Sequence, residues 1–167
     1  LLELAKSVSI VRSNAAKWNI DQNKILVAGF SAGGHLAASI GCFWNQKFVY
    51  EPLGLTAEDI RPDGNILAYP VITSGEFAHR GSFDALCNGL DQEKYLALTS
   101  LENQAGTQNP PTFVWHTNED QAVPVENAFL YIAALRKAKI PVEFHMYAHG
   151  EHGLSLANEE TRSSKNR

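Results

Sequence analysis

Apolar residues along this chain fall into two alternating patterns. Short, continuous apolar runs of the kind found in strands buried on both faces occur at 24–30, 66–72, 112–117 and 142–147. Apolar residues at helical spacing occur over 1–18, 32–43 and 125–138. Strands that alternate with helices predict a parallel sheet with helices on both faces, which is the α/β class.

One connection, from 73 to 111, is longer than a crossover between neighbouring strands requires. We expect short helices at 82–86 and 92–98 within it, and a surface loop in the Gly-rich and polar stretch before Ile66. A long connection at the C-terminal end of a strand commonly shapes a substrate pocket, so we predict a pocket-shaping insertion at 73–111 in a single domain over 1–167. Its candidate substrate-binding residues are Phe77, His79, Arg80 and Phe83.

The composition narrows the classes of function. A content of 44% apolar residues suffices for one core, and a net charge of −4 with no basic stripe argues against nucleic acid as a partner. No apolar run is long enough to span a membrane, so no membrane association is expected. The two cysteines, Cys42 and Cys87, suggest free thiols rather than a disulfide framework.

The residues Gly29-Phe30-Ser31-Ala32-Gly33 form the pattern G-x-S-x-G between a predicted strand and a predicted helix. In that context the pattern predicts a nucleophile elbow, a sharp turn that presents the hydroxyl of Ser31 at the end of the sheet. The glycines at 29 and 33 are expected to keep side chains out of crowded positions. The backbone N–H of Ala32, at the start of the helix, is the expected donor to a developing oxyanion.

A serine nucleophile needs a histidine base and a carboxylate that orients the histidine, in the chain order Ser, Asp or Glu, His. Asp120 follows the predicted strand 112–117 and is our choice for the acid. Glu119 is the nearest alternative, and Asp84 and Asp91 fit less well.

His152 follows the last predicted strand and is our choice for the base, with His149 as the alternative. Glycines at 150 and 153 suit a loop that presents a side chain over the elbow. The histidines at 145, 149 and 152 do not have the spacing of a zinc site, so we expect no metal. His35, one helical turn after Ser31, is a further candidate to line the site, although a packing or capping role is as well supported.

These segments together resemble α/β-hydrolase serine esterases, in particular the acetyl-xylan esterase and endo-xylanase-B-like carbohydrate esterases. The matching segments are 27–37, 68–72, 78–83, 100–103, 109–117 and 123–127. The resemblance implies hydrolysis of small acyl esters, often acetyl groups on a sugar, with a small-molecule or oligosaccharide ester as substrate. No cofactor is implied.

The chain departs from that family pattern at both ends. A second oxyanion donor, often within His-Gly-Gly on an upstream loop, has no counterpart before Ser31, and the end of the chain is polar where a final helix is expected. We therefore expect the C-terminal part of a longer protein, without the N-terminal strands. The strand 24–30 would then have an unpaired edge, which predicts poor solubility, homo-oligomers or domain swapping. A cytoplasmic location is expected if the parent protein has no signal peptide.

Two alternative functions stay open at this point. A serine peptidase of the same fold usually has a bulkier residue, often Tyr, after the serine, so Ala32 favours an esterase. A truncated, non-catalytic remnant with an intact triad is the other alternative.

Overall fold

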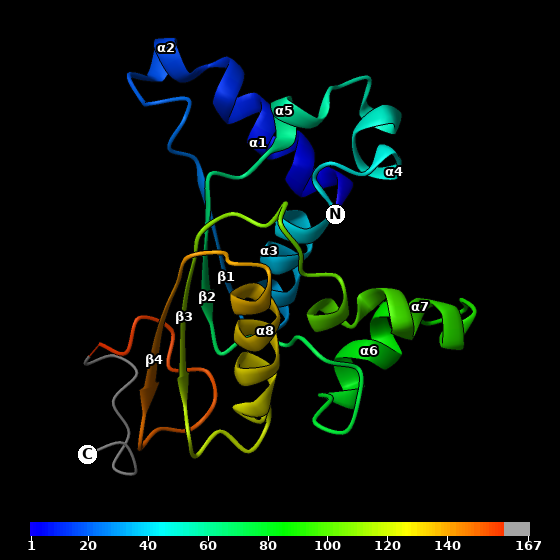
Figure 1. Cartoon of the computed structure of the whole chain (residues 1–167), viewed down its shortest axis with the longest axis vertical. Coiled ribbons are helices and arrows are strands. Elements are labelled where there is room, and N and C mark those ends of the chain that lie inside the picture. The colour runs from blue at the N-terminus through cyan, green and yellow to red at the C-terminus, as the bar shows by residue number, and fades with distance from the viewer. Residues whose placement is uncertain (159–167) are drawn as a thin grey trace.

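The computed structural model describes residues 1–158, the side chain of Gln92 excepted, and its centre is a parallel sheet (Figure 1). The sheet consists of β1 (Leu26–Phe30), β2 (Gly64–Ala68), β3 (Thr112–Thr117) and β4 (Val142–Tyr147), in the spatial order β1-β2-β3-β4. Every neighbouring pair is parallel. The predicted parallel α/β sheet is confirmed, and β3 and β4 have the predicted bounds.

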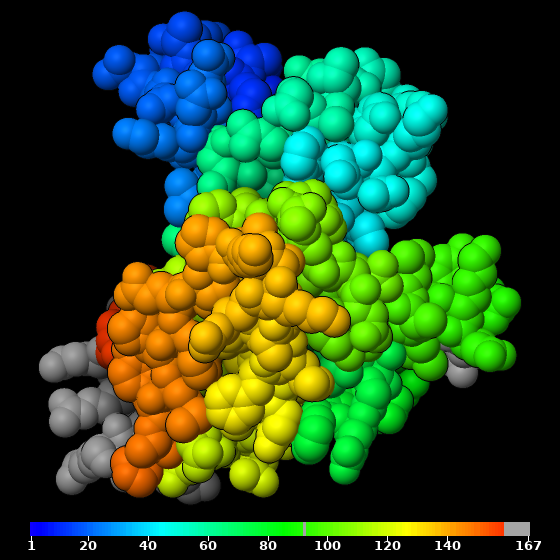
Figure 2. Space-filling model, viewed as in Figure 1, coloured from blue at the N-terminus to red at the C-terminus, as the bar shows by residue number. Residues whose placement is uncertain are grey.

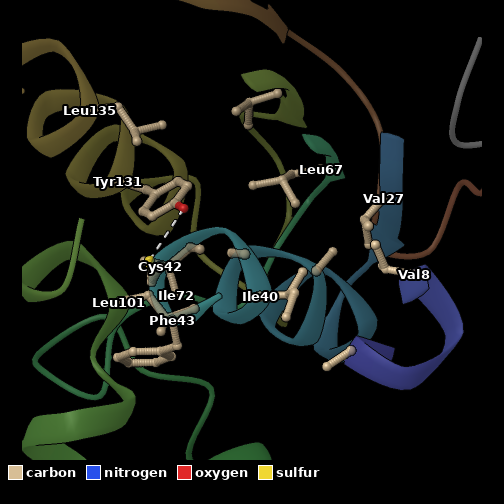
Figure 3. Packing of buried hydrophobic residues seen from close by; sticks show 14 of the residues in the cluster. Val8, Val27, Ile40, Cys42, Phe43, Leu67, Ile72, Leu101, Tyr131 and Leu135 are labelled. Atoms are coloured by element: carbon tan, nitrogen blue, oxygen red, sulfur yellow. Dashed lines mark hydrogen bonds between the residues drawn. The ribbon is translucent and has the colours of Figure 1, made fainter. Parts of the chain in front are cut away.

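Helices α3 (Ala32–Phe43) and α8 (Glu126–Lys137) pack on one face of this sheet. The core between them contains the fully buried side chains of Ile40, Leu67 and Tyr131, and Val8 of α1 (Leu2–Ser13) extends it (Figure 3). The dashed line in Figure 3 joins Sγ of Cys42 to the hydroxyl oxygen of Tyr131, 3.6 Å apart. Burial raises the pKa of the Cys42 thiol, so this cysteine is a packing group rather than a reactive one.

The opposite face of the sheet is more open within the described residues. Side chains alternate along β1, where Leu26 and Phe30 are 56% and 39% exposed while Val27 is buried. In β4 the exposed positions include the polar Glu143 and His145. Helices α3 and α8 thus cover one face of the sheet, and within the described residues several side chains of the outer strands β1 and β4 stay exposed.

Two predicted elements have different bounds in the structure. The predicted helix 1–18 is interrupted at Asn14, and α2 (Ala15–Trp18) follows α1 as a separate turn. The predicted strand 66–72 was wrong in its position, since β2 ends at Ala68. Tyr69 has a positive φ of 37°, and Pro70 has no N–H to donate, so the ladder stops there.

The stretch before β2 was expected to be a surface loop, and this was wrong in part. It forms α4 (Lys47–Tyr50), the 3-10 helix η1 (Glu51–Leu53) and α5 (Ala57–Ile60). Thr56 and Asp59 form a capping box at α5, which explains why so short a helix exists. Val49 and Ile60 from these turns are fully buried, so the stretch covers one end of the core.

The connection 73–111 contains α6 (Arg80–Leu86), α7 (Gln92–Thr99) and the 3-10 helix η2 (Leu101–Asn103). In Figure 2 its green atoms project to one side of the yellow surface of α8. The buried side chain of Asn127 in α8 fixes the start of this connection: its Oδ1 accepts from the N–H groups of Ile72 and Thr73, and its Nδ2 donates to the carbonyl of Phe77. The two predicted short helices are thus present, each slightly longer than expected.

Strand β1 is an edge strand within residues 1–158, since β2 is its only partner there. The unpaired edge expected from the sequence is confirmed, while the expected self-association stays a prediction. No helix in the described part of the chain is long and apolar enough to cross a membrane. Cys42 and Cys87 are both buried and neither forms a disulfide there.

Candidate active site

Ser31 lies in a strained turn between β1 and α3. Its backbone angles are φ 53° and ψ −123°, a combination that a residue with a side chain seldom adopts outside a constrained turn. The Ser31 N–H donates to the carbonyl of Ala68, and the Ser31 carbonyl accepts from the N–H of Val71. These bonds to the end of β2 hold the turn from outside, so the serine is fixed by tertiary contacts as well as by the turn itself.

Two glycines make this turn sterically feasible, and one of them is not a residue that the sequence analysis chose. A Cβ at Gly29 would overlap the carbonyl oxygen of Gly33, which explains why glycine is needed at 29. A Cβ at Gly33 would meet nothing within 4 Å, so the expectation that Gly33 relieves crowding was wrong. Gly34 has that role instead, because a Cβ there would lie 2.8 Å from Cβ of Pro70.

Ala32 is the first residue of α3, so its N–H lies in the helical turn where N–H groups have no intrahelical acceptor. The positive end of the helix dipole adds to the attraction for an anion at this position. Residues before Ser31 form α1, α2 and β1, and the N–H of Ala32 at the start of α3 stays the predicted oxyanion donor.

The structure brings Ser31, His152 and Asp120 together in one hydrogen-bonded row. Oγ of Ser31 lies 2.8 Å from Nε2 of His152, and Nδ1 of His152 lies 2.6 Å from Oδ2 of Asp120. A carboxylate oxygen can only accept, so Nδ1 of the imidazole carries the proton and Nε2 is free to accept the proton of the serine hydroxyl. This is the geometry required of a nucleophile, a base and an orienting acid.

Asp120 is buried and has several hydrogen-bond donors around its carboxylate. Oδ1 accepts from the N–H groups of Ala122 and Val123 at 3.0 and 2.9 Å, an Asx-type turn that fixes the carboxylate within its own loop. Burial by itself raises the pKa of Asp120, but the hydrogen bonds from His116, His152 and Val123 outweigh burial and hold the pKa below its usual value. Asp120 is therefore ionised, as an acid that orients a histidine must be.

His116 is a residue of this site that the sequence analysis included only within the matching segment 109–117. It is fully buried in β3, and its Nε2 lies 2.9 Å from the carbonyl oxygen of Val123 and 3.3 Å from Oδ2 of Asp120. Both neighbours only accept, so Nε2 carries a proton, which it donates to the carbonyl of Val123 with Oδ2 of Asp120 close by. Nδ1 of His116 is buried without a hydrogen-bond partner among the described residues. The sequence signal that could have identified His116 was its place four residues before Asp120.

Tyr69 is a second residue that the sequence analysis did not assign to the site. Its ring lies edge-on to the imidazole of His152, with ring centroids 4.9 Å apart, and edge-on to Trp115 at 5.0 Å. Its hydroxyl oxygen accepts from the N–H of Ser155, 2.9 Å away. Tyr69 thus packs against the base and also fixes the chain just after it.

The alternatives to the acid and the base lie apart from Ser31. Glu119 and His149 pair with each other, since Nδ1 of His149 donates to Oε1 of Glu119 over 3.0 Å. Asp91 caps α7 by accepting from the N–H of Lys94, and Asp84 is exposed on α6. Within residues 1–158 no group of three His, Cys, Asp or Glu side chains is placed to bind a metal ion.

A cavity of about 710 Å³ lies between α3 and the connection 73–111. His35, His79 and Phe83, three of the candidate substrate-binding residues, line it together with Ala32. His35 is fixed there by a hydrogen bond from its Nε2 to the carbonyl of Thr99 and by the ring of Phe83. Burial lowers the pKa of His35, so its imidazole is neutral.

Phe77 and Arg80 do not line this cavity. The guanidinium of Arg80 donates to the carbonyls of Ser74 and Gly75, 3.0 and 2.8 Å away, so it closes its own loop. The backbone of Phe77 is fixed by Asn127, and the ring is half-buried. Sequence proximity to the cavity-lining residues could not reveal which side chains the loop turns inward.

Known proteins resemble this chain in both sequence and structure. It is 41% identical over 162 residues to endo-1,4-beta-xylanase B of Butyrivibrio fibrisolvens, covering 96% of this chain and 25% of that protein. It is 33% identical over 163 residues to an acetylxylan esterase of Xylanibacter ruminicola, covering 92% of this chain and 31% of that protein. The crystal structure of an acetyl ester-xyloside bifunctional hydrolase from Caldicellulosiruptor lactoaceticus is 42% identical and superposes with a TM-score of 0.81, covering 93% of this chain and 57% of that one.

The chain therefore spans a quarter to a third of the curated relatives and just over half of the solved structure. The α/β-hydrolase fold expected from the sequence is confirmed by these matches and by the parallel sheet. Residues 5–166 match the prolyl oligopeptidase family, and the chain belongs to that family.

Proposed function

We propose that the protein is a serine carboxylesterase that hydrolyses small acyl esters, with acetyl esters on xylan or xylo-oligosaccharides as the substrates. The observation that carries this proposal is the hydrogen-bonded row from Ser31 through His152 to Asp120, with contacts of 2.8 and 2.6 Å. In the proposed roles Ser31 is the nucleophile, His152 the base, Asp120 the orienting acid and Ala32 the oxyanion donor.

In the first half-reaction Oγ of Ser31 attacks the ester carbonyl carbon while Nε2 of His152 accepts the hydroxyl proton. The imidazolium that forms is stabilised by the buried carboxylate of Asp120, 2.6 Å from Nδ1. The carbonyl oxygen becomes negatively charged and accepts a hydrogen bond from the N–H of Ala32 at the start of α3. Since that N–H is already oriented by the helix, it needs no rearrangement during the reaction.

In the second step the tetrahedral intermediate loses its alcohol, which takes the proton from Nε2 of His152. The acyl group remains on Oγ of Ser31 as an ester. Water then attacks this ester with His152 again accepting a proton, and the carboxylic acid and the free serine are released. One ester and one water are consumed, and one alcohol and one acid are formed.

The substrate class rests on the relatives and on the residue after the serine. The names of the relatives include an acetylxylan esterase and an acetyl ester-xyloside hydrolase. Ala32, the residue after the serine, lines the cavity between α3 and the connection 73–111, and its small side chain leaves that space open. The connection 73–111 forms one wall of that cavity, which agrees with a pocket-shaping role.

The test is hydrolysis of p-nitrophenyl acetate by the chain and by its Ser31→Ala variant, followed by release of acetate from acetylated xylo-oligosaccharides. We expect the variant to lose about 10⁴-fold to 10⁶-fold in kcat, because the covalent route disappears. Equal rates for the two proteins would contradict the proposal.

A peptidase is the second candidate, because the family to which the chain belongs is named for prolyl oligopeptidase. A proline-containing p-nitroanilide peptide tests it, and faster Ser31-dependent cleavage of that amide than of the acetate ester would favour the peptidase. Stoichiometric labelling of Ser31 by an organophosphonate without turnover of either substrate would favour a non-catalytic remnant.

A further inference from the structure

Consecutive residues of two loops meet beside the base. The acid loop (residues 118–124) follows β3, and the histidine loop (residues 148–153) follows β4. The N–H of Asn118 donates to the carbonyl of Tyr147, the carboxylate of Glu119 contacts His149 and Gly150, and Asp120 contacts His152. These contacts come successively closer to His152 along the chain. The first lies at the end of β4, and the others lie in the histidine loop.

We infer that Glu119 is a positioning residue for the base, and that it acts by fixing the backbone of Gly150 so that the imidazole of His152 stays between Ser31 and Asp120. Its Oε2 accepts from the N–H of Gly150 at 3.1 Å, two residues before His152, while its Oε1 accepts from Nδ1 of His149. The kinetic part of this inference rests on the proposed function.

The hydrogen bond from the N–H of Gly150 to Glu119 is the contact that fixes the position of His152. Gly150 is buried, and a buried N–H without an acceptor is costly, so the Glu119 carboxylate satisfies a group that no water reaches easily. By contrast, the side chains of His149 and Glu119 are 71% and 50% exposed, and exposed ion pairs contribute little.

The histidine loop needs such a contact because glycines give its backbone unusual freedom. Gly150 and Gly153 have φ values of 136° and 90°, which only glycine adopts readily. A Cβ at Gly150 would lie 2.8 Å from Cγ2 of Thr117 and from Cδ1 of Leu154, so no larger residue can stiffen the loop from within. An external acceptor on the acid loop supplies the restraint that the loop's own sequence lacks.

The charge of Glu119 supports the same inference. Hydrogen bonds from His149 and from the N–H of Gly150 hold the pKa of Glu119 below its usual value, so the acceptor is ionised at neutral pH. An ionised acceptor forms a stronger hydrogen bond with a backbone N–H than a neutral one. Glu119 is therefore suited to hold the loop as an ionised acceptor at neutral pH.

The experiment compares four variants of the full chain on p-nitrophenyl acetate. We expect Glu119→Ala to lower kcat about tenfold with KM unchanged, because the base is misplaced while the pocket is intact. Glu119→Gln should lose only about threefold, since its amide oxygen can still accept from Gly150. His149→Ala should stay within about twofold, because it removes only the exposed partner.

The matched control is Glu143→Ala. Glu143 also forms an exposed carboxylate–histidine pair, with His145 on β4, 2.8 Å apart. It contacts neither the acid loop nor the histidine loop in any described bond. Its kcat should equal that of the unmodified chain. A Glu119→Ala variant no slower than Glu143→Ala would overturn the inference, and an equally large effect of His149→Ala would overturn the assignment to the Gly150 backbone.

A readout that needs no turnover separates this inference from the proposed function. The proton on Nδ1 of His152, in its short hydrogen bond to Asp120, should give a downfield proton NMR signal that Asp120→Asn alters. We expect Glu119→Ala to broaden or remove that signal and Glu143→Ala to leave it, with thermal unfolding midpoints showing that both variants fold. If the signal persists unchanged in Glu119→Ala, the inference fails, whatever the unmodified chain hydrolyses.

Discussion

The elbow that holds Ser31 and the two loops that hold Asp120 and His152 are built in different ways. The elbow spans a few consecutive residues, and backbone sterics set it: Gly29 admits the carbonyl of Gly33, and Ser31 takes a positive φ of 53°. The loops come from the ends of two neighbouring strands, and side-chain hydrogen bonds of 2.6 to 3.1 Å join them. The position of Ser31 should therefore be sensitive to small changes of side-chain shape, and the positions of Asp120 and His152 to changes of charge.

The largest effect is expected from a substitution that adds one methyl group within the elbow. Gly29→Ala should abolish esterase activity and lower the free energy of unfolding by about 3 kcal/mol, because the new Cβ overlaps backbone that cannot move aside. Urea denaturation and p-nitrophenyl acetate hydrolysis measure the two effects.

The matched control for that change is Gly33→Ala in the same motif. A Cβ at Gly33 meets nothing within 4 Å and lies within α3, so this variant should be active and more stable by up to about 1 kcal/mol. Equal destabilisation by both variants would contradict the view that the elbow is crowded at 29 and open at 33.

The next largest effect is expected from a substitution that removes the charge of Asp120 and leaves the shape of its side chain nearly unchanged. Asp120→Asn should reduce kcat about 10⁴-fold with little change in KM, because the amide can donate to Nδ1 of His152 and so favours the wrong tautomer. Asp84→Asn, at an exposed aspartate of α6, is the control and should keep full activity. A loss of less than tenfold in Asp120→Asn would point to another acid.

The smallest effect concerns how stability depends on pH. The pKa of Asp120 is lower in the folded chain than its ordinary value, so its ionised form stabilises the fold above the pKa of the unfolded chain. That contribution is lost as pH falls from about 5 through the folded pKa. Urea midpoints between pH 7 and pH 3 should therefore fall, and less steeply in Asp120→Asn. Parallel curves for the two proteins would show that Asp120 has no such linkage.

Most elements of the fold could be predicted from the sequence because their signals are local. The apolar runs predicted the bounds of β3 and β4, and the apolar residues at helical spacing over 32–43 predicted α3. The strand β2 was misplaced because its apolar pattern continues through Tyr69 and Pro70, while the hydrogen-bonding ladder does not. The helix 1–18 was predicted as continuous because helical spacing does not reveal the interruption at Asn14.

The sequence by itself was enough to predict Ser31 as the nucleophile, since the elbow needs only neighbouring residues and the strand and helix around them. It also placed an acid and a histidine at the ends of two later strands, because parallel strands bring their C-terminal ends to one edge of the sheet. The choice between Glu119 and Asp120, and between His149 and His152, depends on contacts that the sequence does not show.

Only the tertiary structure decided how these four side chains pair. The turn after β3 directs Asp120 inward to His152 and Glu119 outward to His149 and Gly150, so adjacent carboxylates have different partners. The structure also placed His116 of β3 beside Asp120, and Tyr69, which follows β2, against the imidazole of His152. The physical reason is that burial and side-chain direction depend on how strands pack, whereas the elbow depends on the backbone of a few residues.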